Sequence, residues 1–257
     1  MSEKVMSNYE KILSYFSDND DNSIKFRNNI NKDDNWMAIA KNYLTYIREN
    51  INKVSNLLDV VNAIYKCASY DLFLDGQEAY LMINFDKKND KYICKLGLMT
   101  NGMVKRLYKS DIVKFIHIDI VYDEEEFEYF LSHDGYNFKH KPDYKLRDNL
   151  IEFGKDGVEI KNNIYDKMLL AYVRYVLNDG TVKIHLCDKK YILKCKKKSN
   201  MGNIWISWPE QMIKKTVIRS SIKELPQLGD IFDDNDEYEA IQSTTQVKSN
   251  VDNLMTL

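Results

Sequence analysis

Apolar residues recur every three or four positions in the first third of the chain, which is the spacing of amphipathic helices. The clearest pattern covers residues 57–70, directly after Asn56, a residue type that favours the N-cap position. Weaker helical patterns cover residues 9–16 and 37–48, and the polar stretch 17–22 between them is typical of a loop.

From residue 79 the period of the pattern changes to two, which indicates β-strands. Alternation over residues 79–85 and 92–98, on either side of a polar turn, predicts a hairpin, and residues 116–122 predict another strand. Asp-Gly pairs, which favour tight turns, begin at residues 75, 134, 156 and 179.

The last of these pairs, Asp179-Gly180, predicts a specific strand register. If these two residues form the loop, one face of the hairpin is apolar in every cross-strand pair: Leu177 with Val182, Tyr175 with Ile184 and Val173 with Leu186. The opposite face would then carry Arg174, Lys183 and His185.

Two further helices are predicted near the end of the chain. The first follows Asp188 as its N-cap and ends at Lys198. The second begins at Ser207, with Glu210 as its capping-box partner, and ends before Pro226, which cannot continue a helix. Helices packed with antiparallel hairpins predict an α+β fold.

Charge is unevenly distributed along the 257 residues, although the formal net charge is only −2. Residues 160–229 contain fourteen basic and five acidic residues, a net charge of +9, whereas residues 230–257 carry −6 and residues 1–159 carry −5. We therefore predict a helical region over residues 1–55, a core over 56–229, and an acidic, disordered tail over 230–257. This asymmetry indicates a basic binding surface with an acidic appendage.

Composition excludes several classes of protein. With 44% hydrophobic and 30% charged residues, the chain is neither collagen-like nor wholly disordered. The four cysteines form no C-x-x-C pair, and no apolar run approaches the roughly 18 residues of a membrane span. A cytoplasmic protein without a membrane anchor is expected.

Motifs for nucleotide or metal chemistry are not found. The sequence has no G-x-x-x-x-G-K-[ST] loop and no G-x-G-x-x-G fingerprint, and its four histidines lack metal-ligand spacing. The run Glu124-Glu125-Glu126 could hold Mg²⁺, but a solvated loop or strand edge is the favoured interpretation. We expect no cofactor, no metal and no catalytic residue.

A small Mg²⁺-dependent nuclease or nuclease subunit stays open as an alternative, as does an oligomeric scaffold that does not bind DNA.

Several segments resemble, in the same order, the RecT family of phage and prophage single-strand annealing recombinases. Residues 204–226 contain Trp, Met, Lys-Thr, Arg and Leu-Pro in the family's pattern near the end of the core. Further resemblances lie in residues 63–84, 102–110, 125–142, 170–182 and 194–200. Ile204 replaces a common Pro, and Asp111 stands where Gly is usual.

The resemblance implies an α+β fold with an antiparallel sheet and packed helices, and a core that oligomerises into rings or helical filaments. It implies binding of single-stranded DNA without ATP, and annealing of complementary strands through a duplex intermediate, with no bond broken. It also implies a phage or prophage origin in a bacterial cell, with a phage exonuclease or a host single-strand-binding protein as partner. The acidic tail could compete with DNA, recruit such a partner, or aid solubility.

The candidate DNA-binding residues are the cations of the segments that resemble the family. Lys215, Arg219 and Lys223 form an i, i+4, i+8 stripe with steps of about 6 Å, close to the spacing of phosphates along a strand. Trp205 could stack on a base, although a core position is favoured. The remaining candidates are Lys214, Lys105, Arg106, Lys109, Lys194, Lys197 and Lys198.

Overall fold

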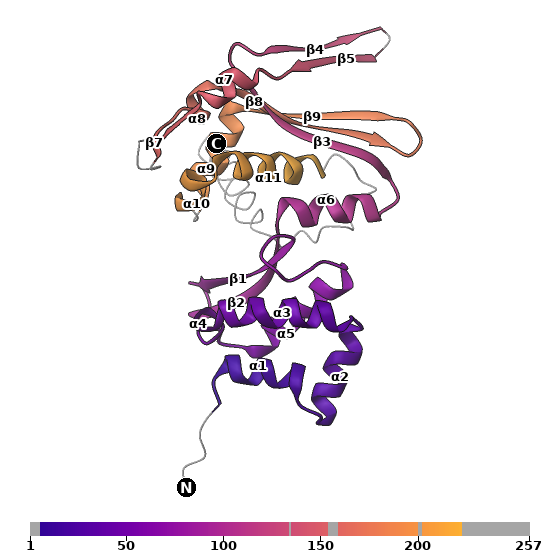
Figure 1. Ribbon diagram of the computed structural model, residues 1–257, viewed down its shortest axis with the longest axis vertical. Coiled ribbons are helices and arrows are strands. Elements are labelled where there is room, and N and C mark those ends of the chain that lie inside the picture. The colour runs from indigo at the N-terminus through magenta and orange to yellow at the C-terminus, as the bar shows by residue number, and fades with distance from the viewer. Residues whose placement is uncertain (1–5, 134, 154–158, 200–201, 223–257) are drawn as a thin grey trace, which may run out of the picture. The chain divides into compact units, whose positions relative to one another are not determined.

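The computed structural model describes residues 6–133, 135–153, 159–199 and 202–222 (Figure 1). The chain divides into two compact units, residues 1–106 and 107–257. The predicted boundary after residue 55 lies inside the first unit, and the acidic tail lies outside the described residues.

Helices of the first unit begin at short polar side chains. Ser7 and Glu10 form a capping box, in which the Ser7 hydroxyl accepts from the Glu10 N–H and the Glu10 carboxylate accepts from the Ser7 N–H. Asp20, Asp33 and Asn56 likewise accept backbone N–H bonds at three later helix starts. The helices are α1 (Asn8–Ser17), α2 (Asp21–Ile30), α3 (Asp34–Tyr46), α4 (Arg48–Ile51) and α5 (Leu57–Ser69).

Helix α2 was not predicted from the sequence pattern. The loop expected at residues 17–22 is shorter in the structure, because Asp20 already caps α2. Of the apolar side chains on α2, Phe26 and Ile30 are buried and Ile24 is exposed. Such a short apolar stripe carries little periodic signal.

A hairpin packs against α5 in this unit. Strand β1 (Ala79–Asp86) pairs with β2 (Lys91–Leu98), as the alternating pattern predicted. Helix α6 (Thr100–Lys109) follows, and a Cβ on Gly102 would lie 2.1 Å from the carbonyl oxygen of Glu78. Only glycine therefore lets α6 approach the chain before β1 this closely.

The second unit is built on an antiparallel sheet in the order β3-β8-β9, with two small hairpins beside it (Figure 1). The strands are β3 (Val113–Tyr122), β4 (Glu126–Ser132), β5 (Gly135–Lys141), β6 (Ile151–Phe153), β7 (Glu159–Asn162), β8 (Met168–Leu177) and β9 (Val182–Asp188). The helices are α7 (Tyr144–Asp148), α8 (Ile164–Lys167), α9 (Lys189–Lys198), α10 (Gly202–Ser207) and α11 (Pro209–Ile222).

Helix α11 covers one face of this sheet. Its Ile213, Val217 and Ile218 are fully buried, and α11 contacts all three strands. Two polar contacts fix the packing: the hydroxyls of Tyr175 and Ser221 lie 2.5 Å apart, and Ser220 Oγ lies 2.8 Å from His185 Nε2. The core of the unit therefore lies between α11 and the sheet.

The predicted register of the β8-β9 hairpin is wrong by one residue. Tyr175 pairs with Lys183 and Val173 with His185, because the loop contains three residues, Asn178 to Gly180. Gly180 has a φ of 86°, the left-handed conformation that closes a three-residue loop. Lys183 and His185 consequently lie on the face with Tyr175, and Arg174 lies on the other face.

The start of the last helix also differs from the prediction. Ser207 is the final residue of α10, while α11 begins at Pro209, a residue favoured in a first helical turn. Glu210 instead accepts a hydrogen bond from the Tyr122 hydroxyl at 2.7 Å. The predicted helix end lies outside the described residues.

The predicted helix after Asp188 is confirmed, since its carboxylate accepts the Tyr191 N–H at the start of α9. The α+β fold class is confirmed as well.

Within the described ranges, no helix combines the length and the apolar character needed to cross a lipid bilayer.

Candidate nucleic-acid interface

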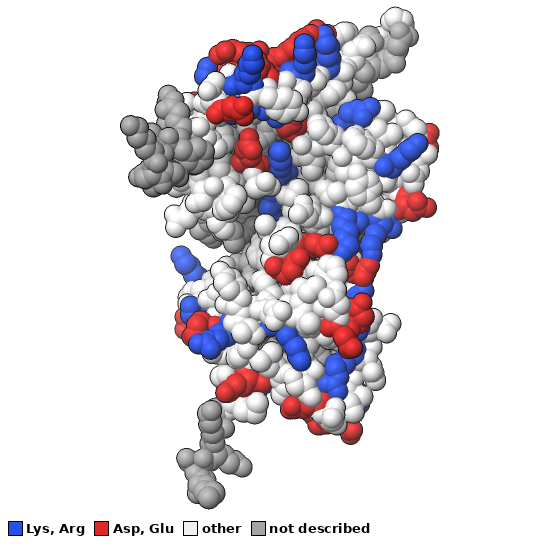
Figure 2. Space-filling view, viewed as in Figure 1, with Lys and Arg blue, Asp and Glu red and all other residues white. Residues whose placement is uncertain are grey.

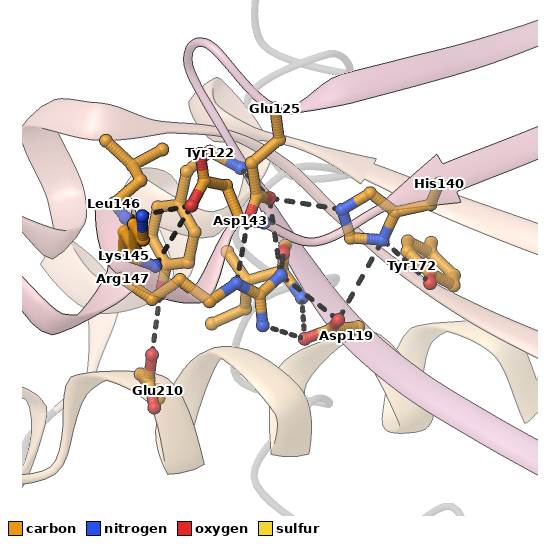
Figure 3. A network of polar contacts seen from close by, with 11 residues as sticks. Asp119, Tyr122, Glu125, His140, Asp143, Lys145, Leu146, Arg147, Tyr172 and Glu210 are labelled. Atoms are coloured by element: carbon orange, nitrogen blue, oxygen red, sulfur yellow. Dashed lines mark hydrogen bonds and ion pairs between the residues drawn. The ribbon is translucent and has the colours of Figure 1, made fainter.

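A buried ion-pair network anchors the hairpins beside the sheet (Figure 3). The Arg147 guanidinium on α7 contacts both oxygens of Asp119, at 3.1 Å each, and donates from Nε to Glu125 at 2.7 Å. The Glu125 side chain is 0% exposed, and it also accepts the backbone N–H groups of Tyr122 and Asp143. Arg147 therefore ties the end of β3, the following turn and α7 together.

His140 on β5 extends this network. Its Nε2 lies 3.1 Å from Glu125 Oε2, and its Nδ1 lies 3.0 Å from the Tyr172 hydroxyl. Figure 3 shows the ring of His140 between these two partners. Burial, together with the negative charge of Asp119, raises the pKa of Tyr172, so its hydroxyl stays protonated.

The pKa values of the ion pair follow from its hydrogen bonds. Burial alone would raise the pKa of Glu125, but the bonds from Arg147, Tyr122, His140 and Asp143 outweigh burial and lower it to about 2. Burial alone would lower the pKa of Arg147, and its bonds to Glu125 and Asp119 raise it instead. Both groups are thus charged at neutral pH.

The acidic run Glu124 to Glu126 is only partly the solvated loop or strand edge that was expected. Glu124 pairs with Lys167 at 2.9 Å, Glu126 pairs with Lys139, and Glu125 is buried as described. Acidic and basic side chains accordingly intermingle over the β4-β5 hairpin (Figure 2). In the part of the chain that the structure describes, no group of three or more His, Cys, Asp or Glu residues is arranged to hold a metal ion.

The predicted cations of α11 differ in their accessibility. Lys215 is 7% exposed, whereas Lys214 and Arg219 are half-buried. Lys223 lies outside the described residues. The predicted stripe therefore does not present a row of equally exposed cations to solvent.

Two of the three predicted cations of α6 hold the local structure of the first unit. Lys105 forms an ion pair with Glu78 at 2.8 Å and lies over the ring of Phe73, and the Arg106 guanidinium lies 3.3 Å from the centre of the Tyr70 ring. Lys109, at the end of α6, is exposed.

The two tryptophans near α10 have opposite environments. Trp205 is 2% exposed, and its carbonyl oxygen accepts a hydrogen bond from the Tyr165 hydroxyl at 2.7 Å, in agreement with the favoured core position. Trp208, three residues later, is 65% exposed, beside the exposed Ile204 and Ile206. Sequence reasoning missed Trp208 because neither composition nor spacing shows which tryptophan faces the core.

Helix α9 carries the most accessible row of cations. Ile192 is fully buried and fixes which side of the helix faces the core, while Lys196 lies 3.6 Å from the centre of the Tyr165 ring and Lys189 donates to the Asp166 carbonyl. The other lysines of α9 are exposed, and no acidic side chain of the described residues pairs with them; they are Lys190, Lys194, Lys197 and Lys198.

We call these four residues the α9 lysine row, and three of them are spaced like phosphates along a strand. Lys190, Lys194 and Lys198 are four residues apart, so successive side chains lie about 6 Å apart along the helix. Lys190 was not among the predicted site residues, although its i, i+4 relation to Lys194 is visible in the sequence.

Comparison with known proteins identifies the family. The model of the RecT family matches residues 37–250, which spans both units of the chain. No curated protein sequence matches the chain. Since the match covers most of the sequence, the chain belongs to the RecT family of single-strand annealing proteins.

Proposed function

We propose that the protein binds single-stranded DNA through the α9 lysine row and anneals complementary strands without ATP. The observation that carries this proposal is the set of four exposed lysines with no acidic partner among the described residues, in a chain of the RecT family. Lysine ammonium groups contact phosphates without reading sequence, so binding of this kind is independent of sequence.

Annealing follows from holding the backbone and leaving the bases free. Contacts to phosphates leave the Watson-Crick edges available to a second strand, and neutralised phosphates repel that strand less. Several copies of the chain, arranged as a ring or helical filament, would repeat one weak site along the DNA and so produce stable binding. No bond-breaking step is needed.

The other predicted cations have secondary roles in this proposal. Lys109, Lys214 and Arg219 are accessible enough to add phosphate contacts, whereas Lys215 chiefly packs within the fold. The acidic tail would meet a phage exonuclease or a host single-strand-binding protein, in a bacterial cell that carries the phage or prophage.

The proposal is tested by mixing complementary oligonucleotides with the protein, in the absence of ATP, and following both duplex formation and strand length. We expect faster duplex formation with strands of unchanged length. Shortening of the strands that depends on Mg²⁺ would instead support the nuclease alternative. Absence of any salt-sensitive DNA binding would contradict both the annealing proposal and the nuclease alternative. It would favour an oligomeric scaffold that does not bind DNA.

A further inference from the structure

The face of the β3-β8-β9 sheet opposite α11 presents two cross-strand rows to solvent. In one row Phe115, Val176 and Val182 lie side by side, and in the next row His117, Arg174 and Ile184 do so. Phe115 is 46% exposed, Val182 and His117 are exposed, and the other three residues are half-buried. This face, which we call the open face, contains no acidic residue in these two rows.

Two aromatic rings on the open face are nearly parallel. The ring centres of Phe115 and His117 lie 6.5 Å apart, and their planes differ by 7°. Two exposed rings with nearly parallel planes offer flat faces on which bases can stack.

Arg174 lies beside these rings on the same face of the sheet. It is directly opposite His117 across the strands, and no hydrogen bond or ion pair joins it to another described residue. A half-buried guanidinium of this kind fits a phosphate, which accepts two parallel N–H bonds.

We propose that the open face is a base-stacking platform for single-stranded DNA, in which Phe115 and His117 stack on bases and Arg174 binds a phosphate. This inference rests on the proposed function and adds a second contact surface to it. Stacking uses the flat faces of the bases and leaves their Watson-Crick edges free, so it is compatible with annealing.

The platform and the α9 lysine row belong to the same unit and are joined by one strand. Ile184, in the row of Arg174, precedes Asp188 at the start of α9 by four residues, a distance of about 13 Å along an extended strand. One DNA strand of several nucleotides is long enough to contact both.

The test compares an oligonucleotide of thymidines with an abasic oligonucleotide of the same length, each titrated against the full chain. Phe115→Leu keeps an apolar side chain but removes the ring, and it should weaken binding of the thymidine probe about tenfold. Binding of the abasic probe should stay as in wild type. Phe130→Leu, which removes an exposed ring on β4, is the control and should leave the affinity for both probes unchanged.

Arg174→Gln should weaken binding of both probes and reduce the salt slope by about 0.7, because it removes one phosphate contact. If wild type binds both probes and Phe115→Leu binds the thymidine probe equally well, the platform is contradicted while the proposed function stands. The platform is also contradicted if Phe115→Leu leaves DNA binding unchanged but alters the mass of the assembly in sedimentation, since a second copy of the chain would then cover this face. If wild type binds neither probe, both proposals fail.

Discussion

Three consecutive glutamates have three different environments in this protein. Glu124 and Glu126 form exposed pairs with lysines, while Glu125 is buried against Arg147 and His140. The partners of Glu125 lie 15 and 22 residues away along the chain, so no local pattern could identify it. A run of charged residues predicts that the segment as a whole is exposed to solvent. Which residue of the run is buried depends on contacts with segments that are distant in the sequence.

Glu125→Gln should lower the free energy of unfolding by about 3–5 kcal/mol at pH 7, because it leaves the Arg147 charge buried with one partner fewer. Glu126→Gln, one residue later in an exposed pair, should lower the free energy of unfolding far less, because solvent screens that pair. Chemical denaturation of both variants measures the difference. An equal loss of unfolding free energy in the two variants would contradict the structural role assigned to Glu125.

The stability that Glu125 contributes should depend on pH. Its pKa is lowered in the folded state from the ordinary 4.5 to about 2, so the ionised form stabilises the fold above pH 4.5. This contribution, about 3 kcal/mol at neutral pH, is lost as the pH falls from 4.5 towards 2. The stability difference between wild type and Glu125→Gln should therefore shrink over this range, and a constant difference would be inconsistent with the assignment.

At the scale of elements, the existence of a strand or helix was easier to predict than its register. The helix after Asn56, the first hairpin and the helix after Asp188 are confirmed because capping residues and periodicity agree. The β8-β9 register failed because an Asp-Gly pair fits both a two-residue and a three-residue loop. One residue of difference moved Lys183 and His185 to the other face of the sheet.

Gly180→Ala tests the three-residue loop. A Cβ at this position meets no atom within 4 Å, so the only cost is the left-handed φ of 86°, about 1–2 kcal/mol for a residue other than glycine. Gly202→Ala, also without neighbours within 4 Å but at a helix start, should not destabilise the protein. Thermal unfolding of the two variants distinguishes them, and an unchanged stability of Gly180→Ala would argue against this loop.

At the scale of the whole molecule, the small net charge hides a basic segment. The sequence was sufficient to locate that segment and to relate it to the RecT family, which the family match confirms. It could not show which cations are accessible: Lys215 is largely buried, Lys105 is paired with Glu78, and the α9 lysine row is open. Accessibility depends on which helix face meets the core, and α9 and α11 both carry lysines on more than one face.

The salt dependence of single-strand binding tests the central claim most directly. Lys190, Lys194 and Lys198 are replaced together by Gln, and the control replaces three exposed lysines of the first unit, Lys87, Lys88 and Lys91. The account predicts that the α9 variant binds a thymidine oligonucleotide more weakly and that its slope of log affinity against log salt falls by about 2, at 0.7 per lost contact. The control should retain the wild-type slope. A folded α9 variant with an unchanged slope would contradict the assignment of α9 as the phosphate-binding element.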